Sequence, residues 1–130
     1  MRIAAFAAAV PLLLRLGLVR LERILEPRRH PPPGDPARIH AVAQRVDWVL
    51  RRARPLVRPG CLTRGLTLFY FLRREGADVS LAFGMGKPGG DFAGHCWLVK
   101  DDEPFLERAD PRHDFPEITR IPRRRPAAQH

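Results

Sequence analysis

The chain has 130 residues, of which 45% are hydrophobic and 28% are charged. This balance is typical of one globular domain and excludes a disordered chain or a large two-domain enzyme. The net charge of +9 comes mostly from arginine, which could mark a surface for nucleic acid, anionic lipid or an acidic peptide. The arginines are spread along the whole chain, however, so coding composition explains this charge equally well.

The first 26 residues carry an apolar run from Ile3 to Leu14 and then arginines among leucines. This pattern predicts a helix, kinked at Pro11 if it is continuous. The run is shorter than the roughly eighteen residues that cross a bilayer, so no membrane span is expected. A signal peptide is disfavoured because its small-residue site would lie inside the run. We expect residues 1–26 to form a docking helix whose apolar face covers the domain or a partner.

Prolines dominate residues 27–36, where they exclude helix and predict an extended linker. Asp35 then offers a helix N-cap, with Pro36 at the first helical position. Apolar residues recur every three or four positions from there to Pro55, which predicts a second helix. A solvated face, rather than a peptide-binding stripe, is favoured for the arginines spaced seven residues apart on this helix, Arg38, Arg45 and Arg52.

A third helix is predicted to begin at Cys61, because Pro59 and Gly60 break the chain before it. Its helical spacing ends at Gly76, a typical C-cap. Free amide groups and the positive end of the dipole at a helix start stabilise a thiolate, the nucleophilic form of cysteine. Position alone nevertheless favours the alternative, an inert small hydrophobe packed under the helix.

The pattern changes after residue 77. Alternation from Val79 to Phe83 predicts a strand. The glycine-rich loop at 84–90 matches neither the phosphate-binding loop nor the dinucleotide fingerprint, so phosphate binding is not expected. Residues 95–100 and 103–107 then predict a hairpin. With a three-residue loop at 100–102, Val99 would oppose Glu103, Trp97 would oppose Phe105, and His95 would oppose Glu107.

That hairpin places a carboxylate beside a histidine. Cys61 as nucleophile, His95 as base and Glu107 as orienting acid would complete the set that thiol catalysis requires. Asp110 lies beyond the pairing and would reach His95 only if the strand bulged, so Glu107 is favoured. Cys96 points to the face opposite His95 by strand alternation and is expected to be a buried packing residue. Two cysteines form neither a disulfide framework nor a zinc set, and no metal or other cofactor is expected.

The motifs around these residues resemble a known family. The resemblance rests on Cys61-Leu-Thr-Arg-Gly, on Gly94-His-Cys-Trp-Leu-Val99 and on Pro104-Phe-Leu-Glu107, within about residues 37 to 115. They are similar to the B2 proteins of lasso-peptide biosynthesis, standalone leader peptidases that are transglutaminase-like cysteine proteases. The resemblance implies an α+β fold of the papain and transglutaminase type, with the nucleophile at a helix start packed on a small antiparallel sheet. The catalytic domain would span 37–119, followed by a basic disordered tail at 120–130.

The resemblance also implies an activity. The enzyme would cleave a ribosomally made precursor between its leader and its core, in the cytoplasm. Cys61 would be the nucleophile and His95 the base, while the family usually has an aspartate where this chain has Glu107. The implied partners are the precursor peptide, a leader-recognition protein and an ATP-dependent macrolactam synthetase. We expect the leader-recognition protein to be separate, since 130 residues leave no room for it.

Two other functions stay open from the sequence. A transglutaminase or another acyltransferase would use the same triad, with an amine instead of water capturing the acyl-enzyme. A noncatalytic basic module, binding nucleic acid for example, is the second. The aromatic residues argue against a nucleic-acid partner, because they fall on apolar periodicities suited to core packing rather than on a stacking surface: Phe69, Phe71, Trp97 and Phe105.

Overall fold

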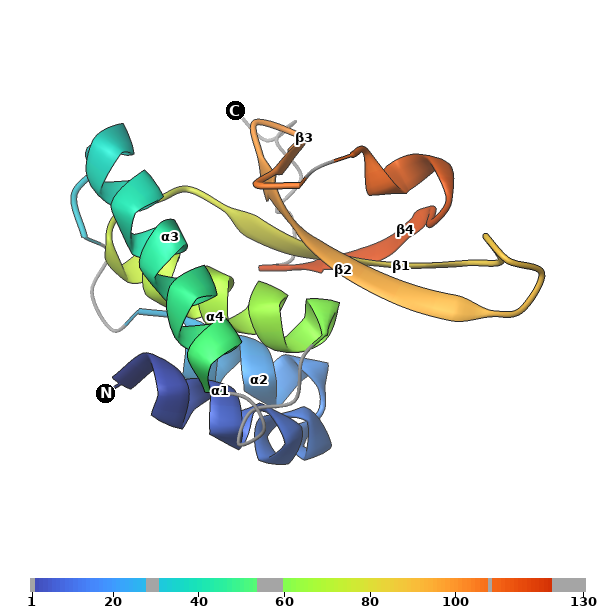
Figure 1. Ribbon diagram of the computed structural model, residues 1–130, viewed down its shortest axis with the longest axis horizontal. Helices are drawn as coiled ribbons and strands as arrows, with labels where there is room; N and C mark the ends of the chain where they lie inside the picture. Colours follow the sequence, from blue (N-terminus) through green and yellow to red (C-terminus); the bar gives the residue numbers. More distant parts are fainter. Residues whose placement is uncertain (1, 28–30, 54–59, 108, 123–130) are drawn as a thin grey trace.

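The protein consists of helices packed beside one antiparallel sheet (Figure 1), so the α+β class expected from the sequence is confirmed. The computed structural model describes residues 2–27, 31–53, 60–107 and 109–122. The helical elements are α1 (Arg2–Leu13), η1 (Leu14–Leu16), α2 (Leu18–Leu25), α3 (Pro36–Arg52), α4 (Cys61–Arg74) and η2 (Pro111–His113). The strands are β1 (Ser80–Gly86), β2 (Ala93–Lys100), β3 (Glu103–Phe105) and β4 (Glu117–Ile121).

The sheet has the order β3-β2-β1-β4, with antiparallel neighbours throughout. Helix α4 packs across one face of β1 and β2, and α1 and α3 pack against α4 (Figure 1). The main core therefore lies between α4 and the sheet. Its fully buried members come from both layers and include Leu66, Phe69, Leu72, Leu81 and Leu98.

A smaller cluster covers the opposite face of the sheet. Trp97 and Val99 are buried there with Phe115 packed against them. Gly84 pairs with His95 across β1 and β2, and a Cβ at Gly84 would come within 2.6 Å of the Phe115 carbonyl oxygen. Only a residue without a side chain lets the backbone at 115 approach this face so closely.

The N-terminal segment differs in detail from the predicted helix. Pro11 lies inside α1, and the chain breaks instead at Gly17, whose φ of 83° is left-handed backbone that glycine adopts readily. Val10, Leu21 and Leu25 are buried in the core, so the apolar side of this segment covers the rest of the domain. None of the described helices is both long and apolar enough to cross a membrane.

Helices α3 and α4 begin where the sequence predicts. The Asp35 carboxylate accepts a hydrogen bond from the Ala37 amide at 3.2 Å and caps α3. Cys61 is the first residue of α4, and Gly76 follows the helix with a φ of 88°.

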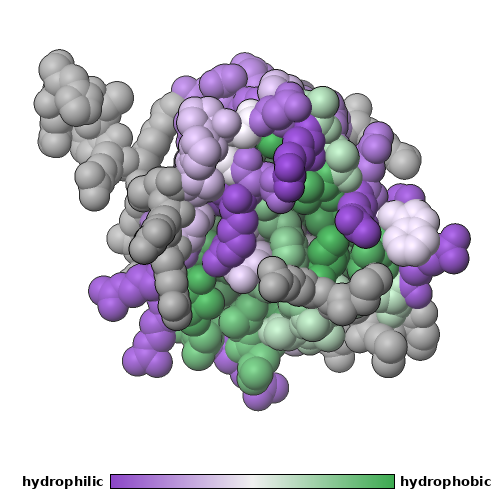
Figure 2. Space-filling view, turned by 90° about the vertical axis from the view of Figure 1, so that its left-hand side faces the viewer, coloured by the Kyte–Doolittle hydropathy of each residue, from purple (hydrophilic) through white to green (hydrophobic). Residues whose placement is uncertain are grey.

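On the face in Figure 2, hydrophilic side chains surround an area of hydrophobic ones. The three arginines of the predicted solvated face are all exposed: Arg38, Arg45 and Arg52.

The predicted register of the hairpin is wrong by one residue. Lys100 pairs with Glu103 and Leu98 with Phe105, so the turn contains only Asp101 and Asp102. Both aspartates adopt positive φ, 52° and 63°, which a two-residue hairpin turn of this type requires at both positions. Aspartate tolerates this backbone better than most residues, so the shorter turn is available.

Strand β4 was not among the predicted elements. It ends at Ile121, which is 2% exposed, so residues 120–121 of the predicted tail belong to the sheet. The remainder of that tail from 123 onward, like 28–30 of the predicted linker, lies outside the described residues. The described part of the linker is held to the domain, because the Gly34 amide donates to the Gly76 carbonyl at 3.1 Å.

Candidate active site

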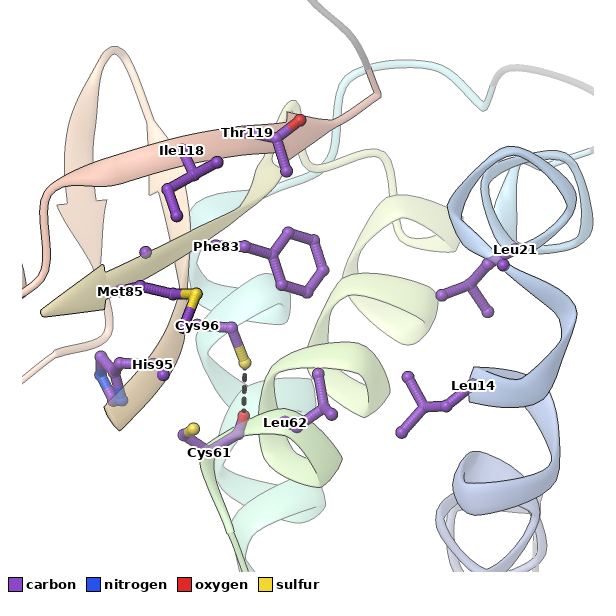
Figure 3. Close-up of a pocket in the computed structure, with 13 residues that line it drawn as sticks. Leu14, Leu21, Cys61, Leu62, Phe83, Met85, His95, Cys96, Ile118 and Thr119 are labelled. Carbon is purple, nitrogen blue, oxygen red and sulfur yellow. Dashed lines mark hydrogen bonds between the residues drawn. The ribbon is translucent and has the colours of Figure 1, made fainter. Parts of the chain in front are cut away.

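Cys61 lies half-buried at the first position of α4, beside the start of β2 (Figure 3). No side chain caps this helix start, where Gly60 is the N-cap residue. The first amides of a helix have no partner within the helix, and they carry the positive end of its dipole. A negatively charged sulfur is stabilised at such a position.

The second cysteine, Cys96 on β2, contacts Cys61 directly. The Cys96 thiol donates a hydrogen bond to the Cys61 carbonyl oxygen at 3.0 Å. Hydrogen bonding from Cys96 lowers the pKa of Cys61 to about 5, with further lowering by His95, against the opposing effect of burial. A hydrogen bond between the two thiol groups, together with burial, raises the pKa of Cys96. The pair is therefore polarised, with the thiolate on Cys61 and the proton on Cys96.

Helix α4 can lie close to Cys96 on β2 because residue 65 is glycine. A Cβ at Gly65 would lie 3.0 Å from Cys96 Sγ and 3.0 Å from a methyl carbon of Leu81. Such distances are tighter than ordinary van der Waals contact, so a larger residue would push Cys96 away from the helix start. Gly65 thus sets the spacing between the helix and the strand that carry the two thiols.

Aromatic rings contact His95 on the face of the sheet opposite α4. Its ring centroid lies 5.8 Å from that of Trp97, in a stacked arrangement, and 5.2 Å from that of Phe115. These contacts restrict the orientation of the imidazole. The side chain keeps 25% of its surface exposed, so substrate and water can reach it.

Glu107 reaches His95, although not through the predicted strand pairing. Its Oε1 lies 3.7 Å from His95 Nε2. Strand β3 ends at Phe105, and the φ of 62° at Leu106 turns the chain out of the ladder. This turn brings Glu107 back toward the histidine. Burial raises the pKa of Glu107, an effect that the charges of His95 and Arg64 oppose.

Arg64 anchors the segment that carries Glu107. Lying one turn after Cys61 on α4, it donates from Nε to Asp47 at 2.8 Å and from Nη2 to the other carboxylate oxygen at 3.3 Å. The same Nη2 donates to the carbonyl oxygen of Leu106 at 3.2 Å. The helix that presents the thiol therefore also fixes the backbone next to the carboxylate.

Asp110 is occupied elsewhere. Its carboxylate accepts hydrogen bonds from the Arg112 side chain, the shortest at 2.6 Å, and from the Arg112 amide at 2.9 Å. The Arg112 side chain and amide hold the pKa of Asp110 down at about 2. Of the two carboxylates considered from the sequence, Glu107 is the one that the structure brings to His95.

His95 lines several hollows, and two of them differ sharply in character. The apolar pocket, of about 490 Å³, is lined by Cys61 and by carbon-rich side chains of the helices and the sheet. The polar cleft, of about 680 Å³, lies on the Glu107 side. Its charged lining consists of Asp47, Arg51, Arg64, Glu107, Asp110 and Asp114. Among the described residues, no three His, Cys, Asp or Glu side chains group as a metal site would.

Three of these contacts are not predicted by any pattern in the sequence. Strand alternation correctly separates Cys96 from His95, but it does not show that Cys96 meets the start of α4. Nor does any local pattern connect Arg64 with Asp47 or with Leu106, 42 positions away. A polar side chain three residues after the expected nucleophile is the only hint, and it is a weak one.

The arrangement can be compared with known proteins. Neither the curated proteins nor the solved structures contain a match to this chain. A family match, to the Transglutaminase-like superfamily, extends over residues 6–120. That span runs from α1 into β4 and includes all of the side chains placed around Cys61. The chain belongs to the transglutaminase-like superfamily.

Proposed function

We propose that this protein is a cysteine peptidase that removes the leader from a ribosomally made lasso-peptide precursor. One observation supports the chemistry above all. A thiol at a helix start, with its pKa lowered to about 5, lies beside a histidine whose Nε2 is 3.7 Å from a carboxylate. Nucleophile, base and orienting acid are the groups that covalent acyl transfer needs.

In the acylation step, the Cys61 thiolate attacks the scissile carbonyl carbon. The Cys61 amide at the start of α4 donates to the developing oxyanion. Protonated His95 then gives its proton to the leaving amide nitrogen, the C–N bond breaks, and the core peptide departs with a new amino terminus. The leader remains on Cys61 as a thioester.

In the deacylation step, neutral His95 takes a proton from water. The resulting hydroxide attacks the thioester carbon, the C–S bond breaks, and the leader leaves as a carboxylic acid with the thiolate restored. Glu107 orients the imidazole through Nε2, which leaves Nδ1 for the proton transfers beside Cys61.

The peptide substrate is proposed from the resemblance of the motifs around Cys61, His95 and Glu107 to the lasso-peptide leader peptidases. The proposed partners are the precursor, a separate leader-recognition protein and the macrolactam synthetase that uses the released core. The test is to incubate the full chain with a precursor and a leader-recognition protein and to follow the products by mass spectrometry. Release of free leader and core by the wild type, but not by Cys61→Ala, is expected.

An acyltransferase reaction is the second candidate, because superfamily membership is compatible with it. Adding a primary amine such as cadaverine to the same incubation separates the two. A peptidase yields leader with a free carboxylate, and an acyltransferase yields leader joined to the amine. A protein that is cleanly folded and produces neither would be a noncatalytic binding module.

A further inference from the structure

The apolar pocket lies against the proposed nucleophile. Cys61 and His95 both line it, and Figure 3 shows Leu14 and Leu21 facing Leu62 across it. Its volume of about 490 Å³ falls in the range of ligand sites in proteins, which is roughly 300–1,000 Å³. Six large apolar side chains form its walls: Leu14, Leu21, Leu62, Phe83, Met85 and Ile118.

No described residue that lines this pocket is an Asp, Glu, Lys or Arg, although 28% of the chain is charged. Three of the lining side chains are also exposed to water, Leu14 at 38%, Met85 at 50% and Ile118 at 65%. Covering such side chains with an apolar group removes apolar surface from water on both partners, which is favourable. A charged group here would lose hydration without gaining a partner of opposite charge.

The two hollows beside His95 match the two halves of a peptide substrate. The acyl half stays bonded to Cys61, which lines the apolar pocket. The amine half takes a proton from His95, leaves as a neutral amine and becomes a cation by taking a second proton from water. The polar cleft beyond His95 has four acids against two arginines in its lining. We propose that the apolar pocket binds a bulky aliphatic or aromatic side chain of the acyl half, within the last two residues before the scissile bond.

This inference rests on the proposed function and gives the N-terminal segment a second role. Leu14 belongs to η1 and Leu21 to α2, so one wall of the pocket comes from residues that precede the proposed linker. Leu21 is 2% exposed and held by the core, whereas Leu14 is 38% exposed. Of the two wall residues in this segment, Leu14 is therefore the one that can be changed with little effect on folding, and it is a specificity-determining residue of the site.

The test uses peptidyl chloromethyl ketones, in which the Cys61 thiolate displaces chloride and forms a C–S bond. Two series, acetyl-Xaa-Ala and acetyl-Ala-Xaa ketones with Leu, Phe, Ala or Asp at Xaa, are reacted with the full chain. Rates are divided by the iodoacetamide rate of the same protein, which depends on the thiol and not on the pocket. In at least one series, Leu and Phe should react about tenfold faster than Ala or Asp, the effect of burying one apolar side chain.

Variants of the pocket wall, with a control outside it, test whether the preference for Leu and Phe arises in this pocket. Leu14→Asn should reduce the ratio of Leu to Ala rates severalfold, and Met85→Gln should do the same from the opposite wall. Leu12→Asn, in which the replaced side chain is 67% exposed and outside the pocket, should leave the ratio unchanged. Equal rates for all four residues in both series, or a preference that survives both pocket variants, would overturn the inference. A Cys61 that iodoacetamide does not modify would instead overturn the proposed function, and this inference with it.

Discussion

The thiol of Cys96 donates a hydrogen bond to the carbonyl oxygen of Cys61 at 3.0 Å. The backbone of the proposed nucleophile is thus tied to the strand that also carries His95. A thiol donor at this place acts on the reactive sulfur in two ways. Its bond to the carbonyl oxygen holds the first turn of α4, and hydrogen bonding between the two thiol groups is the largest cause of the low pKa of Cys61.

The first prediction concerns the pH dependence of Cys61. Because its pKa is lowered to about 5, the thiolate should persist throughout the neutral range and be lost as the pH falls through 5. Alkylation by iodoacetamide, followed by mass spectrometry of the Cys61 peptide, should show this profile. Cys96→Ala removes the donor, so the midpoint should move upward, toward the ordinary cysteine value of about 8.5. Cys96→Ser retains a donor and should lie between the two.

Cleavage should nevertheless survive the loss of Cys96. At about pH 8, a raised midpoint still leaves a substantial fraction of thiolate, so Cys96→Ala should retain substantial peptidase activity, whereas Cys61→Ala should have none. Circular dichroism in the near ultraviolet serves as the control for folding. A folded Cys61→Ala protein that still releases the core would show that another residue is the nucleophile.

A second prediction separates the two carboxylates. Glu107→Gln should lower kcat by orders of magnitude, up to about the 10⁴-fold seen when a triad carboxylate becomes an amide in a serine protease. Asp110→Asn should change kcat little, because the Asp110 carboxylate is bound to Arg112 and not to His95. Steady-state rates of precursor cleavage decide the matter, and the reverse ranking would assign the orienting role to Asp110.

A third prediction makes Arg64 a positioning residue. Arg64→Gln loses the bonds to Asp47 and to the Leu106 carbonyl, and displacement of the Glu107 segment should lower kcat by about tenfold or more. The Arg64 charge lowers the pKa of Glu107, so its removal should shift the acid limb of the kcat profile to higher pH. The control is Arg38→Gln, which breaks an exposed ion pair with Glu75 on another surface. A loss of activity without that shift would indicate a purely structural role.

The fourth prediction tests how firmly the N-terminal segment is built into the domain. Leu25 is fully buried, and Leu25→Ala should lower the free energy of unfolding by about 2–5 kcal/mol through the cavity that it leaves. Leu12→Ala, at a side chain that is 67% exposed, should have little effect. Urea unfolding curves measure both. Equal, small effects would mean that the segment does not fold with the rest of the domain.

Local signals in the sequence are sufficient to predict where α3 and α4 begin. The Asp35 cap, the glycine before Cys61 and the spacing of apolar residues each act within one or two turns, and the structure has helix starts at those places. The hairpin was harder, because its register depends on whether Asp101 and Asp102 both take left-handed backbone. That choice is decided by the pairing of the whole sheet and not by the two residues alone.

The proximity of Glu107 to His95 is a second feature that the sequence predicts only in part. The two side chains lie together as expected, but the reason given from the sequence, direct strand pairing, is incorrect. The turn at Leu106 and its anchor on Arg64 are responsible. Strand β4 is not predicted from the sequence for a related reason: its five residues are stabilised by pairing with β1, more than thirty positions earlier in the chain, and such pairing leaves no local pattern.

The placement of the two cysteines also affects the order in which the protein becomes reactive. A ribosome makes Cys61 well before it makes Cys96 and His95, and chains fold from the N-terminal side as they emerge. Until β2 docks against α4, Cys61 has neither the hydrogen bonding from Cys96 nor the neighbouring imidazole that lower its pKa. An incomplete chain therefore carries an ordinary thiol, mostly protonated at neutral pH, and the reactive thiolate of Cys61 arises only when the sheet has assembled.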